Sequence, residues 1–144
     1  MGTGYFTQPS LCADRIVFVC EDDLWEVDSS GGQARRLTNS RSEIKTPYLD
    51  PSGKWIACCA KEEGDPDVYL MSADGGPLTR LTWLNSVTRI VGWTPDGSSI
   101  LFHSIHQAVH HRGSDAWLFK VGVDGGPVQR LPFGPAVSLN YQQK

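Results

Sequence analysis

The sequence lacks the features that mark several large classes of protein. No run of basic residues is longer than Arg35-Arg36, and the 144-residue chain has a formal net charge of −3. We therefore expect neither nucleic acid nor an anionic membrane surface as a partner. The longest apolar runs, Ile16 to Cys20 and Trp55 to Ala60, are far too short to cross a bilayer.

The chain also lacks an export signal and a recognisable cysteine motif. Its first residues, MGTGYFTQPS, contain no basic segment followed by an apolar one, so we expect a cytoplasmic protein. The cysteines show no CxxC spacing, and two of them are adjacent on a predicted strand. We expect all four to be reduced and partly buried: Cys12, Cys20, Cys58 and Cys59.

No motif for catalysis or cofactor binding is complete. The sequence contains no G-x-S-x-G and no H-E-x-x-H, the arrangements that supply a nucleophilic serine or a catalytic zinc site. Gly2-x-Gly4 has neither a preceding strand nor the third glycine of a dinucleotide-binding fingerprint. We therefore expect no catalytic residue, no metal site and no cofactor, and we expect these residues alone to hydrolyse no peptide.

Three polar groups are candidate ligand sets, but each has a simpler explanation. On a helix, His106 and His110 would share one face and would suit zinc, whereas in the predicted strand-loop-strand context this spacing has no such meaning. The acidic groups Glu21 to Asp23 and Glu62 to Asp67 do not follow the order of a calcium loop, and we favour solvated hairpin turns. We favour a polar hairpin loop for the four histidines, His103, His106, His110 and His111.

The clearest positive feature is an internal repeat that occurs three times. An Asp followed two residues later by an aromatic residue recurs at separations of 44 and 48 residues, in Asp23-Leu24-Trp25, Asp67-Val68-Tyr69 and Asp115-Ala116-Trp117. Gly-Gly and Arg-Leu pairs follow at separations of 44 and 50 residues, namely Gly31-Gly32, Gly75-Gly76 and Gly125-Gly126, then Arg36-Leu37, Arg80-Leu81 and Arg130-Leu131. Such self-similarity indicates one structural unit per copy.

Each copy is predicted to form four short antiparallel strands. Apolar stretches are separated by turn signals such as Asp50-Pro51-Ser52-Gly53 and Thr94-Pro95-Asp96-Gly97, in which Pro fixes φ and Gly relieves the exit from the turn. A period of about 44 residues with four strands is typical of β-propeller blades. We predict an all-β chain with blades at about 5–38, 43–83 and 87–132, second strands near 15–20, 54–60 and 100–104, and the first strand of a fourth blade at 136–144.

The recurring charges are predicted to stabilise each blade. In every copy an Asp that begins the third strand is accompanied by an Arg in the fourth strand, which favours an ion pair between them. The Asp is equally well placed to accept hydrogen bonds from backbone N–H groups of the preceding turn. The three pairs are Asp23 with Arg36, Asp67 with Arg80, and Asp115 with Arg130.

The aromatic residues divide into two groups. Trp25, Tyr69 and Trp117 hold equivalent places in the repeat, and a periodic aromatic residue is typical of the packing layer between blades. Trp55 and Trp83 lack this register. They are the candidates for exposed or channel-facing aromatic side chains.

Over nearly its whole length, the chain closely resembles the N-terminal propeller of tricorn-type proteases. The resemblance is carried by the opening GYFTQPSLCADRIVFVCEDDLWEVDSSGGQARRLT and by DPSGKWIACCAKEEGDPDVYLMSADGGPLTRLT. TolB-type and prolyl-oligopeptidase-type propellers share the turn and the Asp-aromatic strand. The strand Arg15 to Cys20 running into Glu21 to Trp25 near the N-terminus points to tricorn, as do Gly92-Trp93-Thr94-Pro95-Asp96-Gly97 and Gly134-Pro135-Ala136.

The resemblance implies a role that does not include catalysis. In that family a large cytoplasmic assembly trims peptides, a six-bladed propeller stands at a port of the catalytic chamber, and the serine-protease core lies far downstream. No catalytic residue is therefore carried over to this chain. The implied partners are the remainder of the same protease or additional blades, and peptides in transit. Because three blades leave an open arc with apolar end faces, we also expect the chain to associate with further copies of itself. The alternative is a stand-alone, TolB-like propeller that binds proteins, which the missing export signal disfavours.

Overall fold

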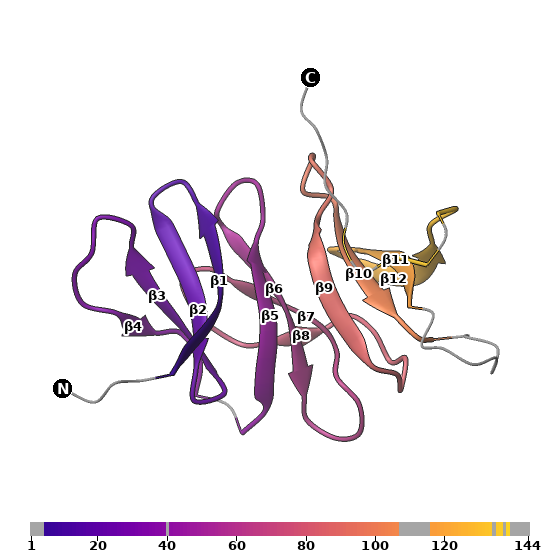
Figure 1. Cartoon of the computed structure of the whole chain (residues 1–144), viewed down its shortest axis with the longest axis horizontal. Helices are drawn as coiled ribbons and strands as arrows, with labels where there is room; N and C mark the ends of the chain where they lie inside the picture. Colours follow the sequence, from indigo (N-terminus) through magenta and orange to yellow (C-terminus); the bar gives the residue numbers. More distant parts are fainter. Residues whose placement is uncertain (1–4, 40, 107–115, 134, 137, 139–144) are drawn as a thin grey trace.

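The computed structural model describes residues 5–39, 41–106, 116–133, 135, 136 and 138, which form twelve strands and no helix. None of them belongs to a helix long and apolar enough to cross a membrane. The strands make three four-stranded antiparallel sheets, called A, B and C (Figure 1). Sheet A contains β1 (Phe6–Cys12), β2 (Arg15–Cys20), β3 (Asp23–Asp28) and β4 (Arg35–Arg36). Sheet B contains β5 (Glu43–Leu49), β6 (Trp55–Lys61), β7 (Asp67–Ser72) and β8 (Thr79–Arg80). Sheet C contains β9 (Thr88–Trp93), β10 (Ser99–Ser104), β11 (Trp117–Gly122) and β12 (Gly125–Arg130).

The second strand of each sheet, β2, β6 or β10, begins and ends within one residue of its predicted place. The hairpin between β2 and β3 is a two-residue turn of Glu21 and Asp22, which have φ angles of 49° and 65°. Two successive left-handed residues form a type I′ turn, whose twist matches that of the flanking strands. The acidic residues of this turn are exposed, as expected for a solvated hairpin.

Neighbouring sheets pack face to face and form two apolar cores. Alternate residues of a strand point to opposite faces, so Ile56 and Cys58 of β6 lie in the core shared with sheet A. Ala57 and Cys59 lie in the core shared with sheet C. The first core also contains Val17, Val19, Leu24, Tyr69 and Met71, and the second contains Ile90, Ile100, Phe102 and Phe119. Each sheet is therefore stabilised chiefly by burial against its neighbour.

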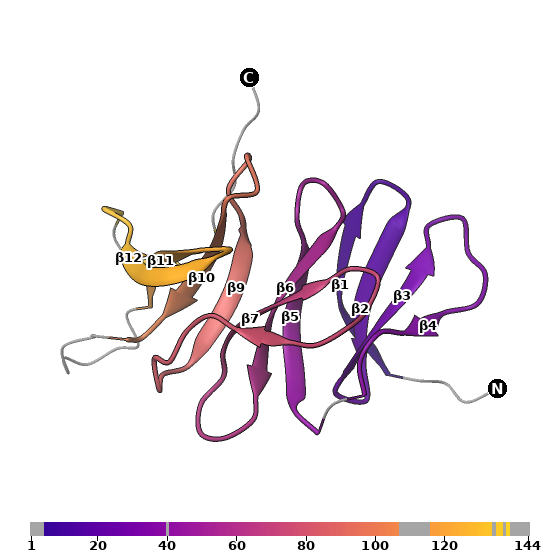
Figure 2. The same ribbon diagram turned by 180° about the vertical axis from the view of Figure 1, so that it is seen from behind.

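The first strand of each sheet lies next to the first strand of the neighbouring sheet, and β1, β5 and β9 together form the common inner edge of the three sheets (Figure 1). Side chains link them: Ser10 Oγ accepts a hydrogen bond from Leu49 N at 3.1 Å, and Trp93 Nε1 donates one to Tyr48 O at 2.9 Å. The fourth strands form the opposite edge of each sheet, as Figure 2 shows for β4. Strands β4 and β8 have only two residues each. Four-stranded antiparallel sheets whose first strands lie side by side at a common inner edge are the blades of a propeller.

The third strand of sheet C is two residues out of register with the predicted repeat. Phe102 pairs with Phe119, as Cys58 pairs with Tyr69 in sheet B. Phe119 therefore takes the place of Tyr69, and the predicted equivalence of Trp117 with Tyr69 is wrong. The physical reason is a longer connection, because Phe102 and Phe119 are 17 residues apart whereas Cys58 and Tyr69 are 11 apart.

Candidate functional site

Asp67 begins β7 and lies at the centre of a buried hydrogen-bond cluster. The residue is 1% exposed. Its Oδ2 accepts a hydrogen bond from Arg80 Nη2 at 2.6 Å, and its Oδ1 accepts from Thr82 Oγ1 at 2.7 Å and from Leu84 N at 2.9 Å. Thr82 Oγ1 in turn accepts from Val68 N at 3.0 Å. Both carboxylate oxygens are thus satisfied, and they tie β7 to β8 and to the chain beyond it.

Sheet A repeats this cluster with Asp23, Arg36 and Thr38. Arg36 Nη2 donates to Asp23 Oδ2, and Thr38 Oγ1 donates to Asp23 Oδ1 at 2.6 Å while accepting from Leu24 N at 2.9 Å. Sequence reasoning missed the threonine, although Thr follows Arg-Leu in both copies. Placing Asp23 and Asp67 in solvated turns was wrong, because both carboxylates are buried by these partners.

In sheet C the described residues show a cation–π contact of the corresponding arginine. Because of the shifted register, Trp117 stands at the head of β11, where Asp67 stands in β7, and the Arg130 guanidinium lies 3.4 Å from the centre of its ring. Pro132 stands where sheet B has Thr82. The predicted partner of Arg130, Asp115, lies outside the described residues.

The remaining aromatic residues differ widely in exposure. Tyr69 is 2% exposed and packs between sheets A and B as predicted, whereas Trp25 is half-buried. Trp55 and Trp83 are 46% and 70% exposed. The Arg80 guanidinium lies 5.4 Å from the centre of the Trp83 ring, so this exposed indole borders the Asp67 cluster.

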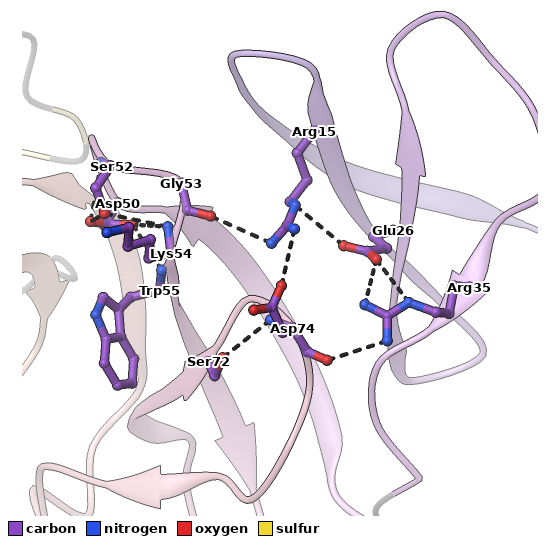
Figure 3. Close-up of polar contacts among 10 residues, drawn as sticks. All are labelled: Arg15, Glu26, Arg35, Asp50, Ser52, Gly53, Lys54, Trp55, Ser72 and Asp74. Atoms are coloured by element: carbon purple, nitrogen blue, oxygen red, sulfur yellow. Dashed lines mark hydrogen bonds and ion pairs between the residues drawn. The ribbon is translucent and has the colours of Figure 1, made fainter.

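A second polar cluster joins sheet A to two turns of sheet B (Figure 3). Arg15 Nη2 donates to Asp74 Oδ1 at 3.1 Å, Arg15 Nη1 donates to Gly53 O at 3.5 Å, and Arg15 Nε lies 3.4 Å from Glu26 Oε2. Arg35 donates to Glu26 Oε1 through Nε at 2.8 Å and Nη2 at 2.5 Å, and to Asp74 O through Nη1 at 3.2 Å. Two arginines of one sheet thereby hold the next sheet.

This cluster borders a groove of about 590 Å³ whose lining includes Arg15, Glu26 and Arg35. The corresponding positions of sheet B carry Trp55, Leu70 and Thr79, so the repeat does not contain this charge pattern. Charges that are already paired with each other are suited to holding the sheets together, since every guanidinium nitrogen of Arg15 and Arg35 lies within 3.5 Å of an oxygen of the protein.

Asp50 organises the turn that leads from β5 to β6 (Figure 3). The residue is 5% exposed. Its carboxylate accepts hydrogen bonds from Ser52 Oγ at 2.6 Å, from Ser52 N at 3.1 Å, and from Lys54 N and Trp55 N, both at 2.8 Å. Burial by itself raises the pKa of Asp50, but these hydrogen bonds together outweigh burial and hold its pKa below the usual value.

Replacing Asp50 with asparagine is expected to lower the free energy of unfolding by about 1–2 kcal/mol at neutral pH. A carboxyl whose pKa is lowered by folding contributes stability above its unfolded pKa and loses it as pH falls through the folded pKa. The difference between Asp50→Asn and wild type should therefore shrink as the pH falls below about 4. Urea unfolding across pH measures it, with exposed Asp14→Asn as the control. A difference that persists unchanged at low pH contradicts the assignment.

No nucleophile lies in a catalytic arrangement among the described residues. Sequence reasoning missed one S-x-x-K spacing, Ser42 to Lys45, but Ser42 is buried while Lys45 is exposed and paired with Glu43. Burial, aided by Arg89, lowers the pKa of half-buried His103. His110 lies outside the described residues, as does His111, and no group of three or more potential metal ligands occurs in the described part of the chain.

The four cysteines are free thiols. Cys20, Cys58 and Cys59 are buried, whereas Cys12 is partly exposed and its Sγ lies 3.7 Å from Pro51 O. Burial raises the pKa of Cys58, and it raises the pKa of Cys59 to about 11. Such thiols carry little thiolate at neutral pH and are poor nucleophiles.

Comparison with known proteins assigns the fold to a family. Residues 3–144 match the family described as the tricorn protease N-terminal beta propeller domain. The chain belongs to this family. It is 33% identical to tricorn protease homolog 1 of Streptomyces coelicolor over 91% of its length. The crystal structure of the tricorn protease superposes on it with a TM-score of 0.82, at 26% identity over 96% of the chain and 14% of the other.

TolB-type propellers share the fold as well. The crystal structure of TolB from Acinetobacter baumannii superposes with a TM-score of 0.72, at 24% identity over 90% of this chain and 33% of that one. The chain spans about an eighth of the length of the Streptomyces homologue and of the Thermoplasma acidophilum tricorn protease. It is an all-β propeller segment of the tricorn type with three four-stranded sheets. The predicted strand at 136–144 lies almost wholly outside the described residues.

Proposed function

We propose that this chain is the N-terminal propeller part of a cytoplasmic, tricorn-like serine protease that degrades peptides, and that it contributes peptide passage or gating, and assembly, while the chemistry lies elsewhere. Membership of the tricorn propeller family supports the first statement. The described residues contain no catalytic arrangement around a nucleophile, which agrees with the proposal that the chemistry lies elsewhere. We also propose that sheets A, B and C are successive blades with bounds near 5–38, 43–83 and 87–132.

The observation that carries the passage proposal is the inner edge. Strands β1, β5 and β9 meet there, and Gln8, Lys45, Tyr48 and Arg89 are exposed on them. Two of these side chains are basic and two are neutral, and Lys45 is paired with Glu43. The edge therefore offers polar, basic and aromatic contacts to passing peptides of varied sequence. In a closed propeller the inner strands surround the central channel.

Assembly is supported by the free face of sheet A. Phe6, Ile16 and Phe18 line an apolar groove of about 380 Å³ on this face, and Phe6 is 66% exposed. The equivalent face of sheet B is covered by sheet A, so we propose that a further blade of the protease covers this one, or a second copy of the chain where no such blade is available. On the free face of sheet C, by contrast, Leu101 and Leu118 are buried.

The alternative function is a stand-alone, TolB-like propeller that binds proteins, which the shared fold with TolB supports. Reading the gene beyond the codon for Lys144 separates the two. We expect further propeller repeats and protease domains, in the same frame or in an adjacent gene. Termination after a few more blades, with no protease gene nearby, would favour the alternative.

A further inference from the structure

The inner strands of sheets A and B each carry a bulge that holds a residue in an unfavourable conformation. In β1 the pairing with β2 skips from Thr7 to Ser10, and in β5 the pairing with β6 skips from Lys45 to Tyr48. Gln8 and Thr46 lie in these gaps with φ angles of 54° and 47°. A left-handed conformation is uncommon outside glycine and is a genuine outlier for β-branched threonine. Such strain persists only where surrounding contacts hold it.

The side chains of these two residues reach the next sheet. Gln8 Oε1 accepts a hydrogen bond from Thr46 N at 2.6 Å, and Thr46 Oγ1 accepts one from Ile90 N at 3.2 Å. Thr46 and Ile90 are separated by the 44-residue repeat, so each contact runs from the bulge of one inner strand to the equivalent backbone N–H of the next. Ile90 has a hydrocarbon side chain and has no acceptor with which to continue the series.

We propose that each bulge side chain is a latch that closes the interface with the following sheet: Gln8 closes the A–B interface, and Thr46 closes the B–C interface. The left-handed backbone aims the side chain across the gap between inner strands, and the hydrogen bond it makes there offsets the strain. Loss of one latch should then loosen one interface and leave the other closed.

Two adjacent cysteines report on the two interfaces separately. Cys58 lies in the A–B core and Cys59 in the B–C core, with exposures of 0% and 1%. Although burial dominates its pKa, Cys59 also interacts with the Thr46 side chain and the Ile90 backbone N–H, so its thiol lies at the second latch. Alkylation of each thiol requires its own interface to open.

The experiment compares alkylation rates of Cys58 and Cys59 in the 144-residue chain, with the modified residue assigned by fragment mass spectrometry. Thr46→Val preserves the β-branched shape but removes the acceptor, whereas Thr46→Ser preserves the hydroxyl. Gln8→Leu and Gln8→Glu form the matching pair for the first latch. Thr46→Val removes the acceptor of the Ile90 N–H. Because the loss of one such hydrogen bond makes opening of the B–C interface easier, alkylation of Cys59 should become about tenfold faster, while that of Cys58 stays unchanged.

Gln8→Leu should accelerate the alkylation of Cys58 and leave that of Cys59 unchanged. The two controls that keep an acceptor, Thr46→Ser and Gln8→Glu, should be alkylated at the wild-type rates. An equal rise at both thiols would mean that the contacts only stabilise the whole fold, and it would overturn the proposal. Unchanged rates, or a rise in Thr46→Ser as large as in Thr46→Val, would overturn it as well. If Thr46→Val does not fold, the Gln8 pair decides by the same criteria.

Discussion

Replacing Phe102 with alanine is expected to lower the free energy of unfolding by about 4 kcal/mol, within the range for truncating a buried aromatic side chain. The residue is 0% exposed in the core between sheets B and C. Its ring is stacked on that of Phe119 at a centroid distance of 5.7 Å. Truncation removes this contact and leaves a cavity that two facing sheets are poorly able to close.

Urea unfolding followed by circular dichroism measures this change. Phe133→Ala removes the same atoms from a residue that is 53% exposed, so its cost should stay below about 1 kcal/mol. Similar losses in the two variants would mean that the packing between sheets B and C does not stabilise the chain in the way described.

Replacing Asp67 with alanine is expected to cost about 3 kcal/mol, because the substitution leaves the donors of Arg80, Thr82 and Leu84 without their acceptor. Arg80 is partly exposed and recovers some hydration, which keeps the loss at the low end of the range for broken buried pairs. Asp67 and Arg80 are thus predicted to stabilise the blade and to take no part in chemistry.

Asparagine at position 67 distinguishes charge from hydrogen bonding. Asp67→Asn keeps one oxygen for Thr82 and Leu84 but loses the ion pair, so its cost should fall to about 1 kcal/mol. Asp65→Ala, in the exposed turn before β7, is the matched acidic control. If Asp67→Ala is no less stable than Asp65→Ala, the buried cluster does not have the proposed structural role.

Local chemistry was enough to predict the strands and the ion pairs of sheets A and B. Period-2 alternation and Pro-Gly turns depend on neighbouring residues, and they located β2, β6 and β10 to within one residue. The prediction that Trp117 is equivalent to Tyr69 was wrong, and the sequence shows why. The aromatic residues recur at 48 residues but the Gly-Gly and Arg-Leu pairs at 50, and this discrepancy of two residues is the register shift that puts Trp117 beside Arg130.

The remaining features depend on contacts between sheets, which no local pattern contains. Arg15 and Arg35 reach Asp74 across some forty to sixty residues of chain, and the equivalent positions of sheet B have no charges of this kind. The bulges at Gln8 and Thr46 place non-glycine residues at positive φ, a choice that propensity disfavours and that only the neighbouring inner strand explains.

Obstructing the inner edge is the most direct test of peptide passage. In the whole protein of which we propose this chain is the N-terminal part, a single cysteine is introduced by Lys45→Cys on inner strand β5 or by Thr79→Cys on outer strand β8, both exposed positions, in a Cys12→Ser background. Each is then coupled to a polyethylene glycol maleimide, and the hydrolysis of long peptides is measured. We expect a several-fold slower turnover with the polymer at position 45 and unchanged turnover with it at position 79. Equal turnover in both conjugates would contradict this expectation.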